Sequence, residues 1–200
     1  MTDYFTLLNE PRRPWIEPET LKSKFLGLSA ALHPDKIQST DAAQAAEDGK
    51  HFADLNAAYN CLREPKERLR HLLELELGQK PKDLQQIPSD LADLFIEVAA
   101  LCREVDAFLR EKGGVSSPLL RAQMFERGHE WDARLRALQK RIKERHAALI
   151  ARLQTLDAEW ISCNGSTNVL LPQLEETWRL FGFFTRWSGQ IQERVAQIAF

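Results

Sequence analysis

The sequence predicts an all-α protein: a helical hairpin within residues 1–78, followed by a C-terminal three-helix bundle. Apolar residues recur at spacings of three and four along most of the 200 residues, as they do on one face of an α-helix. Breaks containing glycine or proline divide this pattern into separate segments, and no segment is predicted as a strand. The hydrophobic share of 44% is enough to bury a core.

Two helices are predicted before residue 33. The first spans roughly Asp3 to Asn9 and is too short to persist without packing on a larger element. The second begins at Pro18, which suits the first helical position, and Ile16 and Leu21 have the spacing of a hydrophobic staple around that start. Its inward stripe consists of Leu21, Phe25, Leu28 and Leu32.

The second helix is expected to end at Leu32-His33-Pro34-Asp35-Lys36. Pro34 fixes its own φ and pushes His33 out of helical geometry. The segment should therefore form a rigid, solvent-facing loop that presents an imidazole and a carboxylate side by side. No catalytic arrangement fits these residues well. The alternative interpretation is a helix end closed by proline, with polar neighbours that have no function.

Two more helices complete the predicted hairpin region. The third should run from about Asp41 to Arg63, with a buried stripe of Phe52, Leu55, Tyr59 and Leu62. The fourth should begin at Pro65 and end at Gly78, where glycine allows a left-handed cap. Helices two and three are expected to pack antiparallel with the loop at residues 33–36 at their tip.

These motifs resemble the J-domain, in which a second helix ends at His-Pro-Asp. Further J-domain features are the Asn-x-Ala-Tyr segment and the Pro-x-x-Arg start of the fourth helix, here Asn56 to Tyr59 and Pro65 to Arg68. The opening Asp-Tyr-Phe-x-Leu-Leu, the segment Arg70 to Leu75 and a helical C-terminal half ending in Phe200 are similar to the HscB family. HscB proteins are dedicated co-chaperones of iron–sulfur cluster assembly.

The chain after the hairpin region is predicted as a linker at 79–88 and a client-binding three-helix bundle at 89–200, as in the HscB C-terminal domain. Ser89 is the expected N-cap of the first bundle helix. A break from Gly113 to Pro118 precedes a long helix from about Leu119 to Trp160. The final helix should follow a second break at 164–166. Its apolar seam predicts packing against the other two helices.

The resemblance assigns roles to two groups of residues near the loop. His33, Pro34 and Asp35 would activate the ATPase partner, and Lys22, Lys24 and Lys36 would dock on it. Positions that are commonly basic in J-domains carry Leu26, Gly27, Ala30 and Ala31 here. This weakened basic face favours a specialised partner. The alternative is that the lysines belong to an ordinary solvated helix face.

The resemblance also places a client-binding patch on the first bundle helix. In HscB proteins a Leu-Met-x-x-Leu-Glu-x-x-Glu type of surface contacts the iron–sulfur scaffold, IscU. The corresponding residues here are Phe95, Ile96, Ala99, Ala100 and Arg103. The leading apolar pair is kept, the next apolar residue is smaller, and both acids are absent. Alternatively, Phe95 and Ile96 belong to the bundle core.

Composition and motifs argue against other classes of protein. The formal charge of −2 gives no general attraction to nucleic acid or an anionic membrane. The basic segment 134–152 is interrupted by acids and lacks stacking aromatics, so a solvated helix face is favoured. No apolar run could span a bilayer, and the N-terminus does not resemble a signal peptide, so cytoplasm is expected.

No enzyme, metal site or cofactor is predicted. His129-Glu130 suggests a helical zinc motif, but Ala133 stands where the second histidine would be. The three cysteines have no metal-ligand spacing and are expected to be buried, inert thiols: Cys61, Cys102 and Cys163.

The sequence therefore predicts a co-chaperone that stimulates a DnaK- or HscA-type ATPase and delivers a client, the iron–sulfur scaffold being the expected one. One alternative is a J-domain protein with a different client. The other is a helical adaptor that no longer activates a chaperone.

Overall fold

The computed structural model describes residues 2–31, 42–82, 87–163 and 167–199, and these residues form helices without any strand. The predicted all-α architecture is thereby confirmed. Contacts divide the chain into two compact units. Unit 1 consists of residues 1–82 and 151–178, and unit 2 consists of residues 83–150 and 179–200. The ranges predicted for the domains stay a prediction, and residues 151–178 of the expected bundle pack within unit 1.

The first two helices of unit 1 have the local signals that the sequence predicts. In α1, Tyr4–Leu7, the side chain of Asp3 caps the start by accepting hydrogen bonds from the backbone N–H groups of Phe5 and Thr6. Helix α2, Pro18–Ala31, begins at the expected proline. Ile16 and Leu21 are both buried, as a hydrophobic staple requires.

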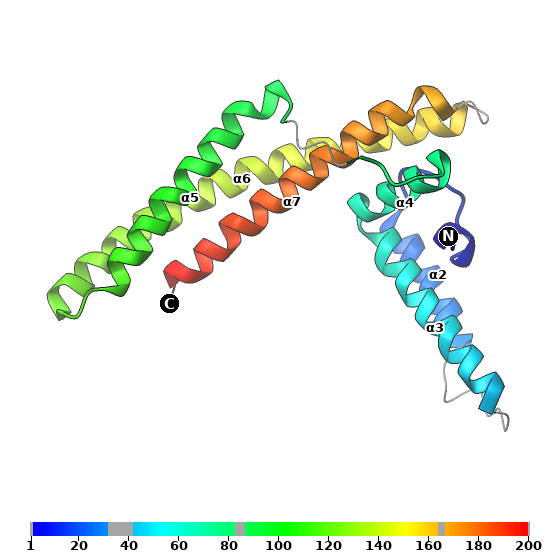
Figure 1. Ribbon diagram of the computed structural model, residues 1–200, viewed down its shortest axis with the longest axis horizontal. Coiled ribbons are helices and arrows are strands. Elements are labelled where there is room, and N and C mark those ends of the chain that lie inside the picture. Colours follow the sequence, from blue (N-terminus) through cyan, green and yellow to red (C-terminus); the bar gives the residue numbers. More distant parts are fainter. Residues whose placement is uncertain (1, 32–41, 83–86, 164–166, 200) are drawn as a thin grey trace. The chain divides into compact units, whose positions relative to one another are not determined.

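Helices α3, Ala42–Arg63, and α4, Pro65–Leu77, also follow the predicted boundaries closely. Pro65 occupies the first turn of α4, and Gly78 ends it with φ of 67°, a left-handed conformation that glycine adopts without steric cost. Figure 1 shows α2 and α3 side by side. Their contact includes the rings of Phe25 and Tyr59, which stack with centroids 4.2 Å apart.

Unit 2 contains α5, Ala92–Gly113, with parts of two helices that also contribute to unit 1. These are α6, Pro118–Ser162, and α7, Leu171–Ala199. Within unit 2, α5 lies along α6 and α7 (Figure 1). The core is built from buried apolar residues of all three helices, including Val98, Val105, Phe108, Leu135, Ile142, Phe181, Ile191 and Val195. No described helix is long and apolar enough to cross a membrane.

One predicted helix start is wrong. The sequence predicts Ser89 as the cap of the first bundle helix, but in the structure Ser89 is the first residue of a short 3₁₀ turn, η1, Ser89–Leu91. Helix α5 then begins at Ala92, and Leu91 provides no side-chain cap. The preceding Pro88 explains the shift, because its fixed φ starts a tight turn whose first hydrogen bond runs from the N–H of Leu91 to the carbonyl of Pro88.

Candidate functional site

The loop with His33, Pro34 and Asp35 lies outside the described residues, as does Lys36. The site is therefore built from the elements that lead into and out of the loop. These are α2, which ends at Ala31, and α3, which begins at Ala42. The two helices hold each other through the Phe25–Tyr59 stack and through buried residues on both of them. Packing of this kind holds together the two helices that precede and follow residues 32–41 in the sequence.

Arg68 explains why a Pro-x-x-Arg segment opens α4. Its side chain is only 2% exposed. The guanidinium donates from Nη1 to the carbonyl of Leu62 at 2.7 Å and from Nε to the carbonyl of Pro14 at 2.8 Å. The Leu62 carbonyl is one of the last four of α3, which have no partner within the helix. Arg68 thus caps α3 and ties the segment before α2 to α4.

Burial lowers the pKa of Arg68 to about 10, so the group stays cationic at neutral pH. Its charge lies over the ring of Trp15, 5.4 Å from the ring centroid. Such cation–π contacts gain strength when water is excluded.

The segment before α2 is also bound to the distal part of α6, within unit 1. Asp157 is buried and forms an ion pair with Arg13, whose Nε lies 3.0 Å from the carboxylate. The same carboxylate accepts the backbone N–H of Trp15 at 3.0 Å. The indole N–H of Trp160 donates to the carbonyl of Arg12 at 3.0 Å. These three contacts fix residues 12–15, which lead directly into α2.

Sequence reasoning missed this cluster. The weak signal in the sequence is the position of Asp157 beside the apolar residues Leu153, Leu156 and Trp160. An acid that is buried among such residues needs a cationic partner. Arg13 is 144 positions away in the sequence, so local patterns do not indicate the pairing.

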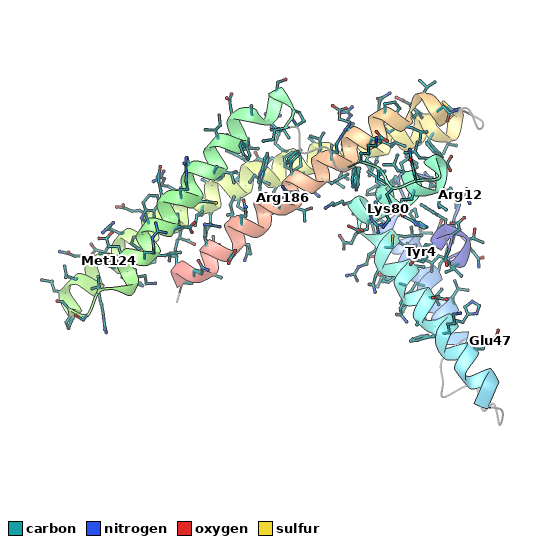
Figure 2. The ribbon with its side chains drawn as sticks, viewed as in Figure 1. Tyr4, Arg12, Glu47, Lys80, Met124 and Arg186 are labelled. Atoms are coloured by element: carbon teal, nitrogen blue, oxygen red, sulfur yellow. The ribbon has the colours of Figure 1, made fainter. Side chains whose placement is uncertain are left out.

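Helix α1 is attached to α4 through His71. The imidazole Nε2 accepts the backbone N–H of Tyr4 at 3.1 Å, and the two rings stack with centroids 4.6 Å apart. Tyr4 is labelled in Figure 2. Because an imidazole nitrogen can accept only when it is unprotonated, this contact requires neutral His71.

This requirement predicts acid sensitivity. Burial lowers the pKa of His71 below its ordinary 6.5, although the carboxylates of Asp3 and Glu74 oppose the shift. The unfolded chain then binds this proton more readily than the folded chain. The contribution of neutral His71 to the free energy of unfolding should be fully present above about pH 6.5. Below that pH the free energy of unfolding should fall, by at most about 1.4 kcal/mol per pH unit for one proton.

The measurement is urea unfolding of the wild type and His71→Gln at about pH 7.5 and about pH 5.5. The variant should lose less stability on acidification, because it lacks this proton. Burial also lowers the pKa of His146, which remains in both proteins and cancels in the comparison. Equal losses in the two proteins would show that His71 contributes nothing to the acid response.

The predicted docking lysines differ in their surroundings. Lys22 is exposed on α2. The amino group of Lys24 lies 2.9 Å from the carbonyl of Asn9 and 2.9 Å from the carboxylate of Glu10. Lys24 therefore holds the chain after α1, and a partner would have to compete with these contacts. Docking by Lys22 and Lys24 stays a prediction.

The predicted client patch lies on α5, and its two leading residues are on the surface. Phe95 is 40% exposed and Ile96 is 62% exposed. Phe95 also packs near the ring of Trp187, at a centroid distance of 6.4 Å, so it combines a bundle contact with an accessible surface. Ala99 and Ala100 are half-buried, and Arg103 is exposed. A role of these five residues in binding stays a prediction.

The remaining sequence candidates are His129 and the basic segment of α6. His129 is exposed and its ring lies edge-on to Phe125. Within the described ranges, no three His, Cys, Asp or Glu side chains gather as metal ligands would. In the basic segment of α6, ion pairs neutralise Arg134, Arg136, Arg141 and Arg152, with Glu104, Asp132, Glu97 and Glu176 as the respective partners.

The cysteines agree only in part with the prediction of buried thiols. Cys61 and Cys102 are buried, and burial raises the pKa of both, to about 11 for Cys61. High pKa values make these thiols poor nucleophiles. The prediction is wrong for Cys163, which is partly exposed because it lies just beyond the end of α6.

Comparison with known proteins identifies structures with the same fold. No known protein-family model matches the sequence. Chaperone HscB from Vibrio cholerae superposes with a TM-score of 0.63 at 17% sequence identity, over 98% of this chain and 99% of that chain. The human co-chaperone protein HscB has a TM-score of 0.62 at 16% identity, over 96% of this chain and 81% of that chain. The similarity extends over both units.

Proposed function

We propose, from the fold that this chain shares with the HscB structures, that it is a J-domain co-chaperone of a DnaK- or HscA-type ATPase. The observation that carries the proposal is the sequence His33-Pro34-Asp35 between two helices that pack as a hairpin. A solvent-facing connection with this sequence is the part of a J-domain that contacts the ATPase. An HscB-like fold with a different sequence at this position would not support the same function.

The proposed role requires no chemistry from this chain. The loop would bind one conformational state of the chaperone more tightly than the other and thereby favour the client-trapping state. A bound protein can shift such an equilibrium only by its difference in affinity for the two states. The packed hairpin and the anchored segment 12–15 support this role, because a loop on a fixed base loses less conformational entropy on binding.

The proposal is tested by the steady-state ATPase rate of a DnaK-type and an HscA-type chaperone during titration with the wild-type chain. We expect saturable stimulation of at least one of them. Stimulation of the HscA type alone would fit the weakened basic face of α2. If neither rate rises, the chain is a helical adaptor that no longer activates a chaperone, and the proposed function is wrong.

We further propose that unit 2 carries the client and that an IscU-type scaffold is the first client to test. The support is the exposed apolar pair Phe95 and Ile96 on α5. Apolar anchors often supply most of the affinity of an interface, whereas charges at the rim mainly set rate and specificity.

If this scaffold is the client, the double variant Phe95→Ala/Ile96→Ala should weaken its binding by about 1–3 kcal/mol in titration calorimetry. Val169→Ala is a matched control, because Val169 is an exposed apolar residue of unit 1 and should not contact the client. If the double variant bound the scaffold as tightly as the wild type does, the client would bind elsewhere on the chain. Absence of binding by the wild type would favour a J-domain protein with a different client.

A further inference from the structure

A groove in unit 2 extends the predicted client patch from α5 onto α7. Its volume is about 490 Å³, and Phe95, Ala99 and Arg103 of α5 line it. The facing residues of α7 include Arg186 and Trp187. Figure 2 labels Arg186 on α7. Ile96 does not line the groove, so the predicted patch is divided between the groove and the neighbouring surface of α5.

The groove has an apolar floor that is already well packed. Trp187 is 3% exposed, and its ring contacts Phe95, Phe183 and Phe184. Phe95 is the member of this aromatic cluster that stays accessible. A partner could therefore place an apolar side chain against Phe95 without rearranging the bundle.

Three acids of α5, one that lines the groove and two that neighbour groove-lining residues in the sequence, form ion pairs. Glu97 pairs with Arg141 at 2.6 Å, and Glu104 pairs with Arg134 at 2.9 Å. These two carboxylates are therefore neutralised by arginines of α6. Asp106, the acid that lines the groove, binds an arginine of α7 at 2.7 Å.

The arginines that line the groove differ from one another in whether they have a partner. Arg194, the partner of Asp106, also donates to the carbonyls of Cys102 and Gln190 and is thus part of the bundle. Arg103 and Arg186 are exposed, and across the described part of the chain neither has a carboxylate within salt-bridge distance. Among the described residues, the groove therefore presents two guanidinium groups without an ion-pair partner beside an accessible phenyl ring.

We infer that this groove binds a protein segment that carries an apolar side chain flanked by carboxylates. The inference rests on the proposed co-chaperone function and specifies the chemistry of its client. Guanidinium groups form strong bidentate hydrogen bonds with carboxylates, and like charges facing them would be repelled. A client segment that presents lysines or arginines to this groove does not fit here.

The test uses two synthetic helical peptides with one apolar face in common, flanked by glutamates in one and by lysines in the other. Fluorescence anisotropy measures their binding to the full chain at low salt. We expect the glutamate peptide to bind about tenfold or more tightly than the lysine peptide, with a difference that shrinks as salt is added.

Substitutions in the groove should change this preference. Arg103→Gln/Arg186→Gln should abolish it, and Arg103→Glu/Arg186→Glu should reverse it. The matched control Lys143→Glu/Arg145→Glu makes the same charge change on exposed residues of α6 and should keep the wild-type preference. Circular dichroism establishes that every variant is folded.

Equal binding of the two peptides, or binding of neither, would overturn the inference. A preference that survives the Arg103→Gln/Arg186→Gln substitution would also overturn it. Displacement of the glutamate peptide by a single-stranded oligonucleotide would assign the groove to nucleic acid instead. ATPase stimulation by the wild-type chain is measured separately. A chain that stimulates the chaperone but fails the peptide test loses this inference and keeps the proposed function.

Discussion

Replacing Arg68 with methionine is expected to lower the free energy of unfolding by roughly 2–5 kcal/mol. Methionine keeps much of the side-chain volume but cannot donate to the carbonyls of Pro14 and Leu62, which the guanidinium binds at 2.8 and 2.7 Å. Each buried carbonyl left without a partner costs about 1–3 kcal/mol. The cation–π contact with Trp15 is lost as well.

The measurement is equilibrium urea unfolding followed by far-ultraviolet circular dichroism. Arg63→Met is the matched control, because Arg63 is exposed at the end of α3, where it pairs with its exposed neighbour Glu64 and lies near the ring of Tyr59. The control should lose no more than about 1 kcal/mol. If the two variants lost equal stability, the buried hydrogen bonds of Arg68 would not hold α3, α4 and the segment before α2 together.

Replacing Asp157 with alanine is expected to destabilise unit 1 by about 3–5 kcal/mol, as breaking a buried ion pair typically does. The change leaves the guanidinium of Arg13 without its carboxylate and the backbone N–H of Trp15 without its acceptor. Because residues 12–15 lead into α2, we also expect hydrogen exchange in α2 to increase in this variant.

Glu111→Ala is the control for Asp157→Ala, because Glu111 forms an ion pair with Arg127 on the exposed surface of unit 2. Its loss should leave the free energy of unfolding close to the wild-type value, because exposed ion pairs contribute little to stability. An Asp157→Ala protein with wild-type stability and unchanged exchange in α2 would contradict the proposed anchoring of residues 12–15.

Helix boundaries can be predicted from the sequence wherever a single residue determines the local backbone conformation. Pro18, Pro65 and Gly78 stand at helix ends because each has a conformational preference that acts without help from the rest of the chain. Ser89 shows the limit of such reasoning. A serine suits a helix cap, but the adjacent proline started a 3₁₀ turn instead.

The contacts that brace the candidate site were beyond prediction from local patterns. The carbonyls to which Arg68 donates, and the pairing of Arg13 with Asp157, depend on which surfaces meet in the folded chain. Spacing rules describe one helix at a time and contain no such information. The exposure of Phe95 and Ile96 was predictable as one of two alternatives, because an apolar residue beside a seam can face either the core or solvent.

The charge of the groove lined by α5 and α7 follows from the sequence and the structure together. The sequence already indicated that Arg103 stands where HscB proteins carry an acid. The structure adds that Glu97, Glu104 and Asp106 are neutralised by arginines, and that Arg186 of α7 lines the same groove as Arg103. Only their arrangement in three dimensions makes the surface basic.

The most direct test of the account is single-turnover ATP hydrolysis by the chaperone with wild-type chain and with Asp35→Asn. The variant keeps the side-chain size and removes one charge, so unfolding stability should change by no more than about 0.5 kcal/mol. We predict that the wild type accelerates hydrolysis and that the folded variant leaves the rate at its unstimulated value. Acceleration by Asp35→Asn equal to that of the wild type would contradict the assignment of residues 33–35 as the activating loop.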